Sequence, residues 1–139
     1  PGWIQHYHHK RYYMNQRASL LTGSVLGLLG VALGAFGAHA LKGMLSASGR
    51  LDTYELAVRY EFYHAFALLA VGILQHHLSS RYLKTSALLF LAGTVLFSGS
   101  LYVLCLSGWT GIAMVTPFGG VLLIFGWLFL AVAVFTGKK

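Results

Sequence analysis

Acidic side chains are nearly absent from this 139-residue chain, in which three Asp and Glu residues stand against ten Lys and Arg. Charged residues make up only 9% of the sequence and hydrophobic residues 57%, whereas a soluble domain carries about 25% charged residues. So few charges do not cover a water-facing surface. The composition excludes an ordinary soluble globular domain and indicates that lipid surrounds much of the protein.

Cysteine and the usual catalytic motifs are also scarce. The one cysteine, Cys105, lies inside an apolar run, which excludes an intrachain disulfide and indicates a buried structural thiol. The chain has no nucleophile motif, phosphate loop, Cys–His zinc set or dinucleotide fingerprint. We therefore expect no enzymatic activity, no cofactor and no resident metal.

The basic residues flank the apolar runs and do not form a basic face interleaved with aromatic residues. Such a distribution is typical of membrane topology signals, and we expect no nucleic acid partner. The polar and aromatic leader, residues 1–17, has no apolar core of the kind a secretory signal carries. Met14 is a candidate start of a shorter product, which would make residues 1–13 an extension before a single transmembrane domain at 18–137.

Four continuous apolar segments are present, at about 18–41, 54–75, 85–107 and 116–136. Each is close to the roughly 20 residues that a helix needs to cross the hydrocarbon core of a bilayer. Membrane-spanning strands would be shorter and would alternate in polarity. The sequence predicts an all-α fold, a bundle of four transmembrane helices.

The distribution of Lys and Arg predicts the orientation of these helices. One side of the membrane would hold Lys10, Arg11, Arg17, Arg81, Lys84, Lys138 and Lys139. The other side would hold Lys42 and Arg50, with Arg59 just inside the second helix. Because positive loops stay in the cytoplasm, both termini are predicted to be cytoplasmic or on the equivalent side.

Glycines recur along the first apolar segment at intervals of three and four residues. They are Gly23, Gly27, Gly30, Gly34 and Gly37, and they form a stripe along one helix face. Helices in lipid associate through close backbone approach, so this stripe predicts a groove that receives another helix. The partner helix belongs either to the same chain or to another subunit.

Four polar residues near the first two helices form a candidate site: His39, Arg59, Glu61 and His64. Glu61 and His64 are three residues apart and share a helix face, so His64 is the expected partner of the intramembrane carboxylate. His39 should lie at a similar depth, because consecutive spanning helices run antiparallel. Its place on the helix is nearly opposite the glycine stripe, so it should meet different neighbours.

Three interpretations of these residues remain open. They form a structural polar network, a site for a ligand, ion or proton, or a metal or haem site. The spacing of Glu61 and His64 matches the carboxylate–histidine motif of bundle metal sites, but only one copy is present. His39 and His64 are candidate axial haem ligands.

Four blocks of sequence, in order, resemble a known family. They are LGAFGAHALK (33–42), YELAVRYEFYHAFALL (54–69), GTVLFSGSLYVL (93–104) and TPFGGVLLIFGWL (116–128). They resemble the YgdD/YwdK-type small membrane proteins, a bacterial four-helix family of uncharacterised function with mitochondrial relatives. The resemblance implies four spans and an inner-membrane location, and it implies no reaction.

The residues and the resemblance together favour a non-enzymatic accessory or assembly subunit of a larger complex in a bacterial inner membrane. The alternative location is the mitochondrial inner membrane. The expected partners are the lipid bilayer and other membrane subunits, or a second copy bound through glycine faces. A small transporter or channel, or a lipid- or quinone-binding protein, is the alternative function, and a haem or metal protein the weaker one.

Overall fold

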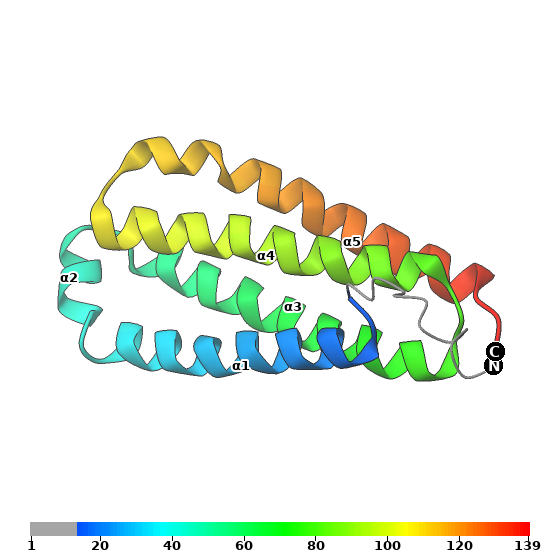
Figure 1. The fold of residues 1–139 in the computed structure, drawn as a ribbon. Coiled ribbons are helices and arrows are strands. Elements are labelled where there is room, and N and C mark those ends of the chain that lie inside the picture. The colour runs from blue at the N-terminus through cyan, green and yellow to red at the C-terminus, as the bar shows by residue number, and fades with distance from the viewer. Residues whose placement is uncertain (1–13) are drawn as a thin grey trace, which may run out of the picture.

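The computed structural model describes residues 14–139, and long helices dominate it (Figure 1). In order they are α1 (Gln16–Ala38), the short α2 (Lys42–Ala47), α3 (Leu51–His77), α4 (Arg81–Ser107), the 3-10 turn η1 (Thr110–Met114) and α5 (Thr116–Thr136). Within these residues four helices are long and apolar enough to cross a membrane. The all-α prediction with four spans is confirmed.

Local sequence explains where these helices begin and end. The Asn15 side chain accepts a hydrogen bond from the Ala18 N–H at 2.9 Å, and the Ser80 side chain caps α4 in the same way. Gly108 ends α4 with a φ of +73°, which favours glycine. Pro117 lies in the first turn of α5, where a missing N–H costs nothing.

The helix limits differ from the apolar segments by a few residues. The second and third helices begin at Leu51 and Arg81, ahead of the predicted 54 and 85. The first ends at Ala38, before the predicted 41. Hydropathy marks the hydrocarbon depth, whereas capping and backbone hydrogen bonds set the helix ends.

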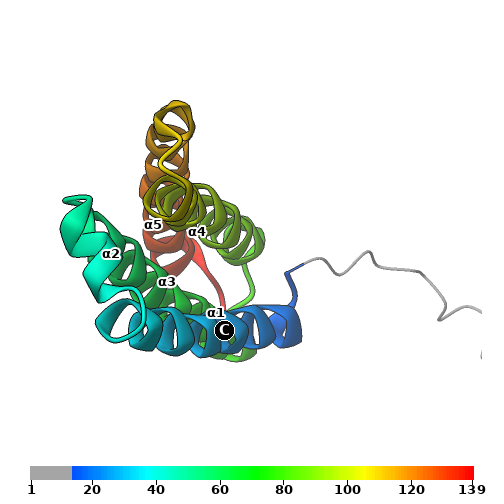
Figure 2. The same ribbon diagram turned by 90° about the vertical axis from the view of Figure 1, so that its left-hand side faces the viewer.

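The spanning helices form a row, with α1 packed on α3, α3 on α4 and α4 on α5. In Figure 1 the spanning helices follow one another from α1 at the bottom through α3 and α4 to α5 at the top, and Figure 2 shows α1 across the bottom of the turned view. A closed bundle would bring the first and last helices together, but here α1 and α5 are the two edges. Most of the surface of each edge helix is therefore exposed to the surrounding lipid.

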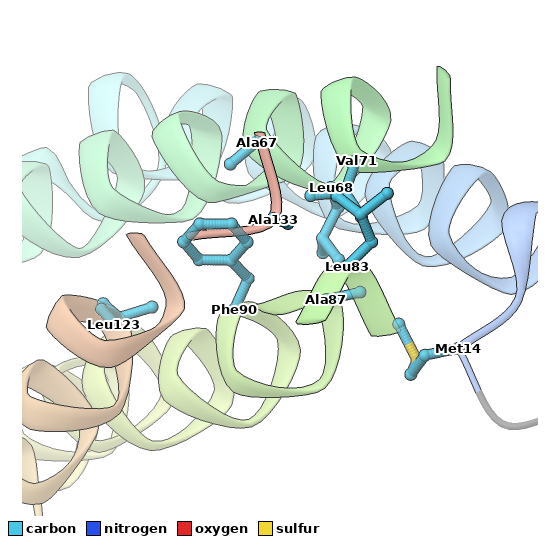
Figure 3. Close-up of a cluster of buried hydrophobic side chains, with 9 residues drawn as sticks. All are labelled: Met14, Ala67, Leu68, Val71, Leu83, Ala87, Phe90, Leu123 and Ala133. Atoms are coloured by element: carbon cyan, nitrogen blue, oxygen red, sulfur yellow. The ribbon is translucent and has the colours of Figure 1, made fainter. Parts of the chain in front are cut away.

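The main core lies between α3, α4 and α5 (Figure 3). It contains Met14, Ala67, Leu68, Val71, Leu83, Ala87, Phe90, Leu123 and Ala133. Phe90 is fully buried, and a Cβ added at Gly126 would lie 2.7 Å from its ring. The core is therefore built by placing a large ring against a residue without a side chain, which lets the helix backbones approach.

One end of the row gathers the first residue of α1, the α3–α4 connection and the last residues of the chain. Asn15, Arg81, Lys84 and Lys139 line one polar hollow there. The backbones of Ser79 and Lys138 pair across it, with Ser79 N–H donating to the Lys138 carbonyl at 2.7 Å. The cytoplasmic assignment of this end stays a prediction, and Lys10 and Arg11 lie outside the described residues.

Candidate intramembrane polar site

The glycine stripe of α1 faces α3 in the same chain. A Cβ on Gly23 would lie 2.9 Å from the Ala65 carbonyl oxygen, and one on Gly30 would lie 3.0 Å from the Phe62 ring. Gly37 lies directly against the Tyr54 ring, and Gly34 lies within contact distance of Val58. Gly27 is different, because an added Cβ there would meet nothing within 4 Å. Four of the five glycines thus form an intramolecular groove.

Glu61 lies on α3 at the centre of this packing and is only 3% exposed. Its Oε1 atom accepts a hydrogen bond from the Tyr102 hydroxyl of α4 at 2.9 Å. Its Oε2 atom has no hydrogen-bond partner among the described residues and faces α1, 3.2 Å from where a Cβ on Gly30 would be. The absent side chain at Gly30 therefore leaves room for the carboxylate between three helices.

His64, also on α3, faces α5. It is 4% exposed, and its Nδ1 donates to the Tyr60 carbonyl at 2.6 Å. Its Nε2 lies 3.1 Å from the Trp127 indole Nε1, which is a donor only. These partners assign the neutral imidazole with the proton on Nδ1. The ring therefore joins α3 to α5.

The predicted partnership of Glu61 and His64 is wrong. Residues three apart differ by about 60° around a helix, so the two side chains of a central helix face different neighbours. Here Glu61 bonds to α4 and lies against α1, while both His64 nitrogens are engaged elsewhere.

His39 does not join this pair. It follows the end of α1 and is exposed, on a hollow with Ala35 and Phe36. Since Gly37 lies against Tyr54, His39 is level with the start of α3, roughly 15 Å along the axis from the level of His64. The prediction of equal depth is wrong, and no shared axial haem site forms.

Arg59 is also exposed, on a hollow with Gly34, Tyr54 and Glu55 at the far end of α3 from the chain's last residues. The structure therefore brings neither Arg59 nor His39 to Glu61. Among residues 14–139, no three His, Cys, Asp or Glu side chains are grouped in a way that would hold a metal ion.

Two partners in this site were missed by sequence reasoning, Tyr102 and Trp127. A usable signal existed, because an aromatic residue with a polar tip in the middle of a spanning helix needs a hydrogen-bond partner there. Other hydroxyls bond across helices in the same way. Ser98 Oγ donates to the Ala57 carbonyl at 2.7 Å, and Ser86 Oγ to the Gly126 carbonyl at 2.9 Å.

The Trp127–His64 bond is open to a direct test. Trp127→Phe keeps the aromatic contact with Phe90 but leaves His64 Nε2 without its donor. We expect the free energy of unfolding in bilayers to fall by about 0.6 kcal/mol, the usual size of such a bond between membrane helices. Trp109→Phe, in an exposed loop, is the matched control. An equal loss in both variants would contradict the assignment.

These features define a class: a multi-pass α-helical membrane protein whose intramembrane polar side chains mostly bond across helices. Residues 33–120 match the family described as protein of unknown function (DUF423). The chain belongs to this family, which agrees with the resemblance inferred from the four sequence blocks.

Curated relatives support the assignment over most of the chain. A UPF0382 membrane protein of Staphylococcus saprophyticus is 43% identical over 84% of this chain and 95% of its own length. The UPF0382 membrane protein YwdK of Bacillus subtilis is 40% identical over 82% of this chain and 93% of its own. The UPF0382 inner membrane protein YgdD of Escherichia coli K12 is 36% identical over 91% of this chain and 95% of its own length.

The names of these relatives agree with the predicted location in a bacterial inner membrane. No solved structure matches the chain. The mitochondrial relatives expected from the resemblance stay a prediction.

Proposed function

We propose that this protein is a non-enzymatic accessory or assembly subunit of a larger inner-membrane complex. The main support is the open row of helices, which leaves α1 and α5 as edges with long surfaces at lipid depth. A protein of this size without a closed bundle has more surface for neighbouring helices than it has internal volume for a pathway.

The polar side chains inside the row support a structural role for the site. The Tyr54 hydroxyl donates to the Leu33 carbonyl, which ties α3 to α1. The Tyr102 and Trp127 contacts tie α3 to α4 and α5. Each bond joins two helices, as expected of side chains that hold a scaffold together.

The outer face of α1 is the best candidate for a subunit contact. This helix is the least buried of the four spans. Its outer side carries a hollow of about 320 Å³ lined by Ala32, Ala35, Phe36, His39 and Ala40. Small side chains allow a partner helix to approach closely, which is the main source of helix association in lipid.

The proposal predicts a partner of fixed stoichiometry. The protein is extracted at native abundance in a mild detergent and separated on a native gel, and mass spectrometry identifies what migrates with it. Ala35→Trp should fill the hollow and release the partner. Phe135 lies at the end of α5 and is 91% exposed, so Phe135→Trp should leave the complex intact. A stand-alone monomer in the unmodified protein would contradict the proposal.

A second candidate function, proton or ion movement in a small transporter, is favoured by one observation. Glu61 Oε2 is buried, and no residue within 14–139 gives it a hydrogen bond. Intramembrane carboxylates commonly mark ion or proton sites. Transport would require Glu61 to be essential for flux in a protein that still folds without its charge. The Glu61 variants described in the Discussion separate the two functions.

A further inference from the structure

A groove lies between α3 and α5 on the side of the row. Its walls and floor come from Tyr60, Tyr63 and His64 of α3, Phe97 of α4, and Gly120, Leu123, Ile124 and Trp127 of α5. Its volume is about 440 Å³, within the range of about 300–1,000 Å³ typical of small-molecule sites. Because α3 and α5 both pack on α4 and not closely on each other, the groove between them opens sideways at the depth of the hydrocarbon core.

The walls of the groove are aromatic and held in place by one another. Tyr60 stacks on Phe97 with ring centroids 4.6 Å apart. Trp127 meets His64 edge-on at 5.9 Å and Phe90 at 4.9 Å. Rigid aromatic surfaces of this kind favour a flat ring over a flexible chain, because ring stacking adds to ordinary contact.

Two tyrosine hydroxyls, those of Tyr60 and Tyr63, belong to residues that line the groove, and each can donate a hydrogen bond. Among the described residues, none accepts a hydrogen bond from the Tyr60 or Tyr63 hydroxyl, whereas Tyr54 and Tyr102 both have acceptors. A hydroxyl without an acceptor at hydrocarbon depth is costly. A lipid acyl chain has no polar atom to offer, so the donors call for a ligand that carries carbonyl or ether oxygens.

We propose that this groove binds a ring-headed prenyl lipid of the quinone class. The ring lies between the aromatic walls, its carbonyl oxygens accept hydrogen bonds from the tyrosine hydroxyls, and its tail leaves sideways into the bilayer. Binding alone is proposed, and no chemistry on the ring is implied. This ligand site goes beyond the subunit role and does not depend on it.

Gly120 provides a way to fill the groove without disturbing the helices. A Cβ added there would lie 3.8 Å from the Phe97 ring, which is ordinary contact distance. A leucine at this position therefore extends into the groove and leaves the α4–α5 contact in place. Gly27→Leu, on α1 where an added Cβ meets nothing within 4 Å, is the matched control.

The test uses the full chain in lipid nanodiscs with Trp3→Phe and Trp109→Phe, so that Trp127 is the sole tryptophan and can be excited apart from the tyrosines. A ubiquinone analogue with a short prenyl tail is titrated, and quenching of Trp127 is followed. We expect saturable quenching above the linear background from probe dissolved in the bilayer. Gly120→Leu should weaken the apparent affinity by about tenfold or more, or about 1.4 kcal/mol, while Gly27→Leu should leave it unchanged.

If Gly120→Leu fails to fold, Ile124→Trp, at another residue that lines the groove, serves the same purpose. Because this variant adds a second tryptophan, its affinity is measured by the displacement of a bound radiolabelled analogue and not by fluorescence. Only linear quenching, or equal affinity in the groove and control variants, would overturn the proposal. Displacement by oleic acid at the same concentration as by the ring-headed analogue would also overturn it, because the occupant would then be an alkyl chain.

Discussion

Gly119→Ala should lower the free energy of unfolding by about 2 kcal/mol, whereas Gly120→Ala, one residue later, should be almost neutral. A Cβ at Gly119 would lie 2.8 Å from the Phe97 Cα and 2.9 Å from the Leu96 carbonyl carbon. These atoms belong to the backbone of α4, so relief requires that α4 and α5 move apart. At Gly120 the nearest atoms belong to the Phe97 ring at 3.8 Å, and a methyl group fits.

The comparison is made by reversible unfolding in mixed detergent micelles, followed by far-ultraviolet circular dichroism. Both variants replace the same residue type in the same helix turn, so helix propensity cancels between them. Loss of close contact along α4–α5 also disturbs the Ser100–Thr116 bond at the start of α5. Equal stability of the two variants would show that the backbones are not in close contact at Gly119.

Glu61→Ala should be the second large effect, with a loss of about 2 kcal/mol. The change leaves the hydroxyl of the half-buried Tyr102 without its acceptor and opens a void between three helices, where Glu61 is buried. An unsatisfied buried group costs about 1–3 kcal/mol. Glu61→Gln should cost far less, because its amide oxygen still accepts from Tyr102 and a neutral amide is easier to bury at this depth than a carboxylate.

The same pair of variants separates the two candidate functions. If Glu61 only stabilises the row, Glu61→Gln should keep stability, abundance and the copurifying partner. If Glu61 carries protons or ions, Glu61→Gln should abolish flux in proteoliposomes although the protein stays folded. Tyr102→Phe is a useful third variant, because it removes the donor to Oε1 and keeps the ring contact with Tyr54.

Much of the fold follows from features that can be read along the sequence: composition, apolar runs and the spacing of glycines. The composition and four apolar runs predicted the all-α fold and the four spans, because lipid allows only structures that satisfy their own backbone hydrogen bonds. The periodic glycines correctly marked the face of α1 that is packed closely, since the absence of side chains is a local property. Neither feature depends on knowing which helices are neighbours.

The same features did not predict which polar side chains bond to each other. Glu61 and His64 are close in sequence and share a face, yet they bond to Tyr102 and Trp127, which are 41 and 63 residues further along the chain. A side chain's partner depends on the order of helices around α3 and on their depth relative to one another. The level of His39 was misjudged for the same reason.

The amino-acid sequence alone is enough to place this protein in a membrane, to predict four spanning helices and to mark the face of α1 that has no side chains. The open row of helices, the exclusion of Gly27 from the packed stripe and the aromatic groove between α3 and α5 emerge only when the helices are packed together. Membrane insertion depends on the summed hydropathy of each segment, whereas packing depends on close contacts between segments far apart in the chain.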